Sequence, residues 1–111
     1  MTDPHGTHCW FELTTPDAPA AEAFYAAVTG WVPRDAGMPG MRYTLVGPAD
    51  HAIGGIMALT DEMKAGGARP GWTGYVAVAD VDAAAAKVRS LGGNVYMPGT
   101  DIPGVGRFAI V

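Results

Sequence analysis

Residues 17–32 read DAPAAEAFYAAVTGWV, and residues 80–95 read DVDAAAAKVRSLGGNV. Each segment begins with an aspartate that suits a helix N-cap, continues through alanine-rich sequence, and reaches a glycine that suits a helix C-terminus. The matching positions are Asp17 with Asp80, Ala20 with Ala83, Gly30 with Gly93, and Val32 with Val95. The sequence therefore predicts two copies of one strand–helix–strand unit.

A second match follows each helix. Residues 42–46 (RYTLV) parallel residues 107–111 (RFAIV), and a Pro-Gly pair precedes both. Both segments read as strands. A further strand is expected at 53–59 in the first copy, whereas the second copy stops at Val111. We therefore expect a second module without its last strand, completed by chain beyond Val111 or by a partner, because an unpaired strand edge invites pairing.

The expected fold class is α+β, with one domain over residues 1–111. Module one is expected at 8–60, a linker at 61–71 and module two at 72–111. The expected strands are 8–15, 31–35, 41–47, 53–59, 72–79, 94–97 and 105–111, and the expected helices are 18–29 and 81–91. In the first helix, Phe24 and Val28 lie four residues apart and are expected to form the buried stripe, with Ala20 or Ala21 one turn earlier.

Composition excludes several classes of function. Hydrophobic residues make up 49% and charged residues 16% of the chain, which is typical of a globular domain. The net charge of −4 and the lack of a basic stripe argue against nucleic acid as a partner. No apolar run approaches the length of a membrane span, and no basic amphipathic helix is evident. With one cysteine, Cys9, an internal disulfide is impossible, so a reducing, cytoplasmic location is expected.

Five short motifs point to a family. They are residues 10–17 (WFELTTPD), 30–31 (GW), 75–84 (YVAVADVDAA), 91–93 (LGG) and 103–108 (PGVGRF). In this order and spacing they resemble the vicinal oxygen chelate superfamily, which includes glyoxalases, bleomycin resistance proteins and extradiol dioxygenases. The resemblance covers nearly all of the chain from Cys9 onward. It implies that two βαβββ-type modules form a curved mixed sheet around a cup that holds a small molecule.

The resemblance also implies where a metal would bind. Metal-dependent members hold a divalent ion through His and Glu ligands from strands of both modules. The corresponding positions are Trp10, Thr73 and either Gly55 or Met57, and the fourth lies in the missing strand. Indole, hydroxyl and thioether groups are poor ligands for Zn²⁺, Ni²⁺ or Fe²⁺. We therefore expect no metal and no cofactor.

Strand alternation predicts which side chains line the cup. The predicted ligand-binding residues are Trp10, Glu12, Met57, Thr73 and Tyr75. Two aromatic rings, a thioether and a single carboxylate suit a planar or amphipathic small molecule. The alternative is that Trp10 and Tyr75 only fill the interior of the sheet.

Glu12 is the sharpest individual candidate, because a carboxylate in the middle of an apolar strand needs a partner or a function. It is a weak candidate for a catalytic base, and a salt bridge with Arg42 or Arg107 is the simpler interpretation. His8 is expected on the same face, where it could join Glu12 in an unorthodox metal set. Cys9 is expected to be a small buried hydrophobic residue.

Three functions remain open. The first is a metal-independent small-molecule-binding protein of the glyoxalase and bleomycin-resistance type. The second is a lyase, isomerase or dioxygenase-type enzyme with an unorthodox metal site or with Glu12 as its base. The third is a dimerising structural module with a vestigial cup. A homodimer is the expected assembly, because one module buries both faces of its sheet poorly.

Overall fold

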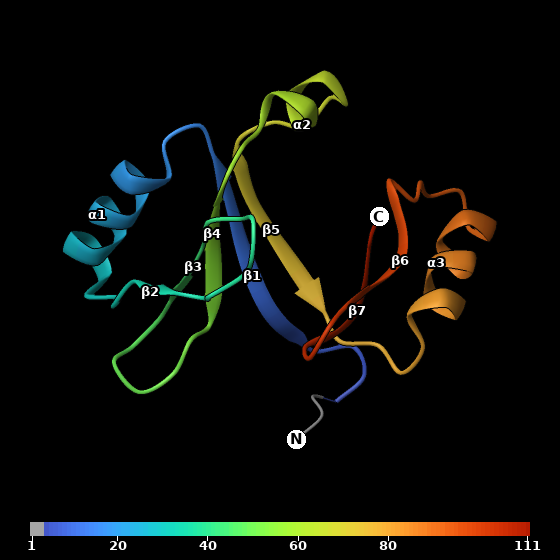
Figure 1. Ribbon diagram of the computed structural model, residues 1–111. Coiled ribbons are helices and arrows are strands. Elements are labelled where there is room, and N and C mark those ends of the chain that lie inside the picture. Colours follow the sequence, from blue (N-terminus) through green and yellow to red (C-terminus); the bar gives the residue numbers. More distant parts are fainter. Residues whose placement is uncertain (1–3) are drawn as a thin grey trace. The chain divides into compact units, whose positions relative to one another are not determined.

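The computed structural model describes residues 4–111 and has the α+β class that the sequence predicts (Figure 1). The elements are β1 (His8–Thr15), α1 (Ala18–Thr29), β2 (Arg34–Asp35), β3 (Tyr43–Val46), β4 (Gly54–Ala58), α2 (Asp61–Ala65), β5 (Gly71–Val76), α3 (Val81–Ser90), β6 (Met97–Ile102) and β7 (Gly106–Ile110). None of the helices within residues 4–111 combines the length and apolarity that crossing a membrane requires.

The described chain divides into two compact units, a larger one at His8–Val76 and a smaller one that joins residues 4–7 to Ala77–Val111. The larger unit contains a mixed five-stranded sheet of order β2-β3-β4-β1-β5. β1 lies between a parallel neighbour, β4, and an antiparallel neighbour, β5. β5, the expected first strand of module two, therefore completes the sheet that module one begins.

The core of the larger unit lies between α1 and one face of this sheet. Its buried members are Leu13, Ala18, Val46 and Ile56, with Ala21, Tyr25 and Trp31 packed around them. The helix ends are set locally, as the sequence predicts. The Asp17 carboxylate accepts the Ala20 amide at 3.1 Å, and Gly30 closes the helix with a left-handed φ of 76° that favours glycine.

The predicted buried stripe of α1 is confirmed at Ala21 and wrong at Phe24 and Val28. Phe24 is 57% exposed and Val28 is 64% exposed. The helix instead turns Ala18, Ala21 and Tyr25 toward the sheet, with the i, i+3, i+7 spacing of a single face. The small side chains of Ala18 and Ala21 let α1 lie close to the strands. The helix therefore buries this face and leaves the face with Phe24 and Val28 exposed.

Two other expectations about elements differ from the structure. The segment expected as a linker at 61–71 begins with the short helix α2, which Thr60 caps by accepting the Met63 amide. The strand expected at 94–97 is displaced, since β6 begins only at Met97. Pro98 and Gly99 suggest a turn, but an edge strand tolerates a proline, and a register irregularity after Met97 accommodates it.

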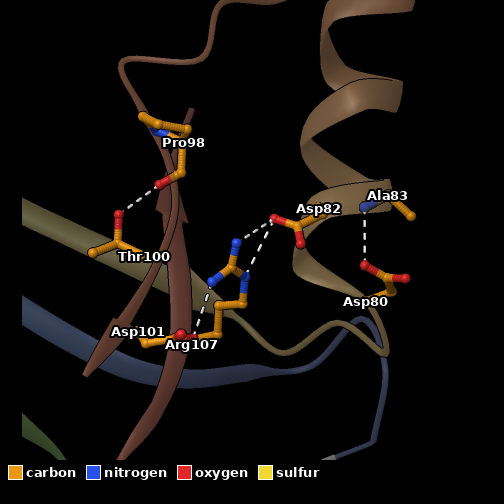
Figure 2. A network of polar contacts seen from close by, with 7 residues as sticks. All are labelled: Asp80, Asp82, Ala83, Pro98, Thr100, Asp101 and Arg107. Atoms are coloured by element: carbon orange, nitrogen blue, oxygen red, sulfur yellow. Dashed lines mark hydrogen bonds and ion pairs between the residues drawn. The ribbon is translucent and has the colours of Figure 1, made fainter. Parts of the chain in front are cut away.

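The smaller unit joins α3 to the β6–β7 hairpin through one arginine. Arg107 on β7 donates through Nε (3.2 Å) and Nη2 (2.9 Å) to Oδ1 of Asp82 on α3, and through Nη1 (3.0 Å) to Asp101 on β6 (Figure 2). Asp80 caps the same helix through the Ala83 amide. Charged hydrogen bonds of Arg107 therefore tie β7 both to α3 and to β6.

Truncation of an exposed side chain on the outer surface of α1 should leave the stability of the larger unit nearly unchanged, whereas truncation of a side chain buried beneath α1 should lower it. Ile56 is fully buried, so Ile56→Ala is expected to lower the free energy of unfolding by about 2–5 kcal/mol. Val28→Ala, at an exposed position of α1, is the matched control and should change it by less than about 0.5 kcal/mol. Urea denaturation followed by circular dichroism measures both. Equal losses for the two variants would contradict the assignment of the buried face.

Candidate functional site

The sheet of the larger unit has two faces, and α1 packs against one of them. Leu13 and Ile56 lie in register beneath this helix. Their neighbours along each strand point to the opposite side, because successive side chains alternate. We call that side the Trp10 face. It carries Trp10, Glu12 and Thr14 of β1, Tyr43 and Leu45 of β3, Gly55 and Met57 of β4, and Thr73 and Tyr75 of β5.

Polar contacts join three strands across the Trp10 face. The indole Nε1 of Trp10 donates to the hydroxyl of Tyr43 at 2.9 Å, and the hydroxyl of Tyr75 donates to Oε2 of Glu12 at 2.7 Å. All four side chains are partly buried. An indole can only donate, so the Tyr43 oxygen acts as its acceptor and keeps its own proton for another partner.

Burial and Glu12 together keep both phenols protonated. Burial is the main cause that raises the pKa of Tyr43 to about 12; the hydrogen bond from Trp10 lowers it, and the charge of Glu12 and a hydrogen bond with it raise it further. Burial is also the main cause that raises the pKa of Tyr75, followed by the hydrogen bond to Glu12 and the charge of Glu12. The carboxylate thus accepts from the neutral Tyr75 hydroxyl and lies near the neutral hydroxyl of Tyr43.

Gly55 makes room for the Tyr43 ring. A Cβ atom built on Gly55 would overlap the Cε1, Cζ and hydroxyl oxygen of Tyr43. The glycine is buried in β4 beside Glu12 of β1, its partner in the parallel register. The absence of a side chain at this position therefore lets the tyrosine lie down over the sheet and reach Trp10.

The structure brings the five predicted ligand-binding residues to this one face. Trp10 pairs with Tyr75, Glu12 pairs with Thr73, and Thr14 pairs with Met57. Whether these residues bind a ligand stays a prediction. Sequence reasoning missed Tyr43, although the repeat aligns it with Phe108 and the Gly54-Gly55 pair signals a close approach from a neighbour.

The expected salt bridge of Glu12 is wrong. Arg42 pairs with Glu22 of α1 at 3.0 Å, and Arg107 pairs with aspartates of the smaller unit. Arg42 and Thr44 are two residues apart in extended chain, so both side chains lie on the α1 face. There both contact the Glu22 carboxylate. Glu12 accepts from a tyrosine hydroxyl instead.

The expected side of His8 is also wrong. The ring of His8 stacks on Phe11 with an interplanar angle of 3° and lies against Gly74, both on the α1 face. A register irregularity between His8 and Trp10 reverses the alternation at this end of β1. His8 therefore does not converge with Glu12. Cys9, expected to be buried, is exposed.

The side chains of the Trp10 face do not fit a divalent metal. Glu12 is the one carboxylate among them, and no group of three or more His, Cys, Asp or Glu side chains converges anywhere in residues 4–111. A thioether, a phenol and an indole do not replace the missing ligands. No chemical step on this face is therefore derived through a metal.

Two hollows lie elsewhere in the larger unit. One, of about 290 Å³, is apolar and is lined by Phe11, Trp31, Ile53, Gly54 and Trp72. The other, of about 260 Å³, is lined by Glu22, Pro33, Arg34, Asp35, Arg42 and Thr44. Trp72 donates to the Tyr25 hydroxyl at 3.0 Å, and Thr44 to Glu22, so both hollows border α1. The first is built on aromatic packing and the second on paired charges, so the Trp10 face remains the better candidate.

Gly55→Ala tests the position of the Tyr43 ring. The added methyl group should displace Tyr43, break its hydrogen bond with Trp10, and lower the free energy of unfolding by about 1–3 kcal/mol. The indole ¹H–¹⁵N resonance of Trp10 should move at the same time. Gly66→Ala, where the backbone is not left-handed and the nearest atom lies 3.5 Å away, should stay within about 1 kcal/mol of the wild type. An unchanged Trp10 resonance in Gly55→Ala would contradict the arrangement.

The raised pKa of Tyr43 predicts a loss of stability in strong base. In the unfolded chain the tyrosine releases its proton near the ordinary pKa of 10.0, whereas in the folded protein it holds the proton until about pH 12. The folded state binds more protons in this interval, so stability should fall as pH rises from about 10 to 12. Ultraviolet titration should show a late phenolate component from Tyr43 and Tyr75, which Tyr43→Phe should reduce and Tyr96→Phe should leave unchanged. Titration of all four tyrosines near pH 10 would contradict the prediction.

Comparison with known proteins agrees with this fold. The family model of the Glyoxalase/Bleomycin resistance protein/Dioxygenase superfamily matches residues 8–111. "Putative glyoxylase CFP32" of Mycobacterium bovis is 39% identical over 107 residues, which cover 96% of this chain and 40% of that protein. Anthracycline biosynthesis protein DnrV of Streptomyces peucetius is 36% identical over 104 residues, covering 93% of this chain and 36% of DnrV.

A third relative, anthracycline biosynthesis protein DauV of Streptomyces sp. strain C5, is 30% identical over 118 residues, covering 95% of this chain and 42% of DauV. The chain therefore spans about two-fifths of the length of the curated relatives it matches. The family model extends over nearly the whole chain, from the first residue of β1 to Val111. The chain belongs to the Glyoxalase/Bleomycin resistance protein/Dioxygenase superfamily.

Proposed function

We propose that this chain is a metal-independent small-molecule-binding member of its superfamily, and that the ligand lies on the Trp10 face. The observation that carries the proposal is the composition of this face. Trp10, Tyr43 and Tyr75 surround a single carboxylate, Glu12, and the hydrogen bonds among them fix the rings in place. Rings that are already ordered lose little conformational entropy when a ligand stacks on them.

The chemistry of the face indicates a planar aromatic ligand. Aromatic rings offer large apolar area with a preferred stacking geometry, and Met57 adds a polarisable, adaptable side chain beside them. Two relatives are named anthracycline biosynthesis proteins, and this supports aromatic compounds as the first class to test. The positions at which the superfamily would place metal ligands hold Trp10, Thr73 and Gly55 or Met57, which supports binding without a metal.

An enzyme that uses Glu12 as a base is the second candidate. Glu12 is favoured for this role because two neutral phenols flank it and would orient its oxygens toward a bound substrate. The name of the mycobacterial relative points in the same direction. Turnover of a bound compound that Glu12→Gln abolishes, with binding retained, would favour this candidate.

The three tryptophans provide the test, because they report different faces. An anthracycline is titrated into ¹⁵N-labelled protein that has been treated with a chelator, with elemental analysis to verify that metal is absent. The indole resonance of Trp10 should shift, while those of Trp31 and Trp72, which pack beside α1, should stay in place. Trp10→Phe assigns the signal.

Binding should survive removal of the metal, and Trp10→Ala should weaken it by about 5- to 30-fold, since one buried aromatic contact is worth about 1–2 kcal/mol. Phe24→Ala, on the outer surface of α1, is the matched control and should bind as the wild type does. Binding that appears only after a divalent metal is restored would overturn metal independence. Shifts confined to Trp31 and Trp72 would place the ligand in the apolar hollow instead.

A further inference from the structure

We propose that the ligand of the Trp10 face is an aromatic cation, a planar ring system whose protonated amine contacts Glu12. The inference rests on the proposed function and adds the charge and the hydrogen-bonding character of the ligand. The hydrogen-bond donors and acceptors of this face that are already engaged within the protein carry the inference.

The donors nearest to Glu12 are engaged within the protein. The single indole N–H of Trp10 goes to Tyr43, and the hydroxyl proton of Tyr75 goes to Glu12. The Tyr43 hydroxyl accepts from Trp10 and lies close enough to Glu12 for the carboxylate to raise its pKa. A ligand that brings an acceptor to Glu12 therefore finds the indole and Tyr75 donors occupied, and the exposed Thr73 hydroxyl is the donor left beside it.

Acceptor capacity, in contrast, remains. A carboxylate offers about four lone-pair positions, and the Tyr75 hydroxyl uses one of them. The remaining positions suit an ammonium group, which carries three donors and no acceptor. Thr73, the register partner of Glu12, is exposed and adds a hydroxyl at the same level of the sheet.

The charge of Glu12 has no cationic partner among the ion pairs of residues 4–111. The larger unit contains four arginines and lysines, and none of them forms an ion pair with Glu12. Arg34 is the register partner of Leu45, but its guanidinium donates to the carbonyls of Pro48 and Ala49, and Arg42 pairs with Glu22 on the α1 face. Lys64 and Arg69 lie in α2 and the loop after it, outside the strands. A bound cation would supply the missing opposite charge in a partly desolvated setting.

The rings around Glu12 favour the same ligand. The faces of indole and phenol rings attract cations through their quadrupoles. Trp10, Tyr43 and Tyr75 surround the carboxylate, so an ammonium group at Glu12 would contact both anion and ring faces. A carboxylate ligand would meet like charge and electron-rich rings.

Three probes with one ring system separate charge from stacking. They are 2-naphthylmethylammonium, the neutral 2-naphthylmethanol and the anionic 2-naphthoate, each titrated while the Trp10 indole resonance is followed. The cation should bind about tenfold more tightly than the alcohol, and the anion more weakly than either. Glu12→Gln keeps an acceptor for Tyr75 and removes the charge, so it should bring the cation and the alcohol within about threefold. Glu62→Gln, on the exposed surface of α2, should retain the tenfold preference.

Each outcome separates the inference from the function on which it rests. Equal affinity of the three probes, with Trp10 shifting in all cases, would overturn the charge preference and leave an aromatic-binding face. Tighter binding of the anion would overturn it as well. No shift of Trp10 with any probe would overturn the proposed site itself. The wild-type comparison alone decides these cases, so the test does not depend on the folding of Glu12→Gln.

Discussion

The pairing of β1 on both of its edges is the constraint on which the larger unit depends. With β4 on one side and β5 on the other, β1 is held in a single register, and its alternation then decides both faces of the sheet. Leu13 is committed to the core beneath α1, so Trp10 and Glu12 are committed to the opposite side. A shift by one residue would exchange the two sets and bury the carboxylate under the helix. The core and the candidate site are therefore consequences of the same register.

The sequence predicted well those features that local interactions determine. The bounds of α1, its cap at Asp17 and its stop at Gly30 depend on neighbouring residues, and all three are confirmed. The buried stripe of α1 was not predictable in the same way, because a thin alanine face and a bulky face containing Phe24 are both plausible until the strands beneath are known. The side of His8 depends on an irregularity in the pairing of β1 with β5, which lies between strands far apart in the sequence.

The candidate site shows the same limit. Alternation brought Trp10, Glu12, Met57, Thr73 and Tyr75 to one face, because it is a property of each strand alone. The partner of Glu12 is a tyrosine across the sheet, whereas sequence reasoning chose an arginine by charge. Tyr43 reaches Trp10 only because Gly55 leaves space in a third strand. Such a contact requires knowledge of strand order, which no single segment carries.

Both units use an arginine at the start of a strand to secure a helix. Arg42 reaches Glu22 on α1, and Arg107 reaches Asp82 on α3. The arginines match in the internal repeat, but their carboxylate partners occupy different helical positions. A long, flexible arginine side chain can reach a carboxylate over a range of positions. The same kind of ion pair therefore forms in both units although the carboxylates lie at different helical positions.

The strand order of the larger unit also determines when its sheet can form during synthesis. β1 leaves the ribosome before its two neighbours, which arrive only with Gly54–Ala58 and Gly71–Val76. At roughly 5–20 residues per second, β1 waits for several seconds with both edges unpaired. During this interval the β3–β4 pair can form as a local hairpin, since its strands are close in sequence. Closure of the sheet is therefore a late, long-range event, and the nascent chain exposes Trp10 and Phe11 to chaperones until β5 has emerged.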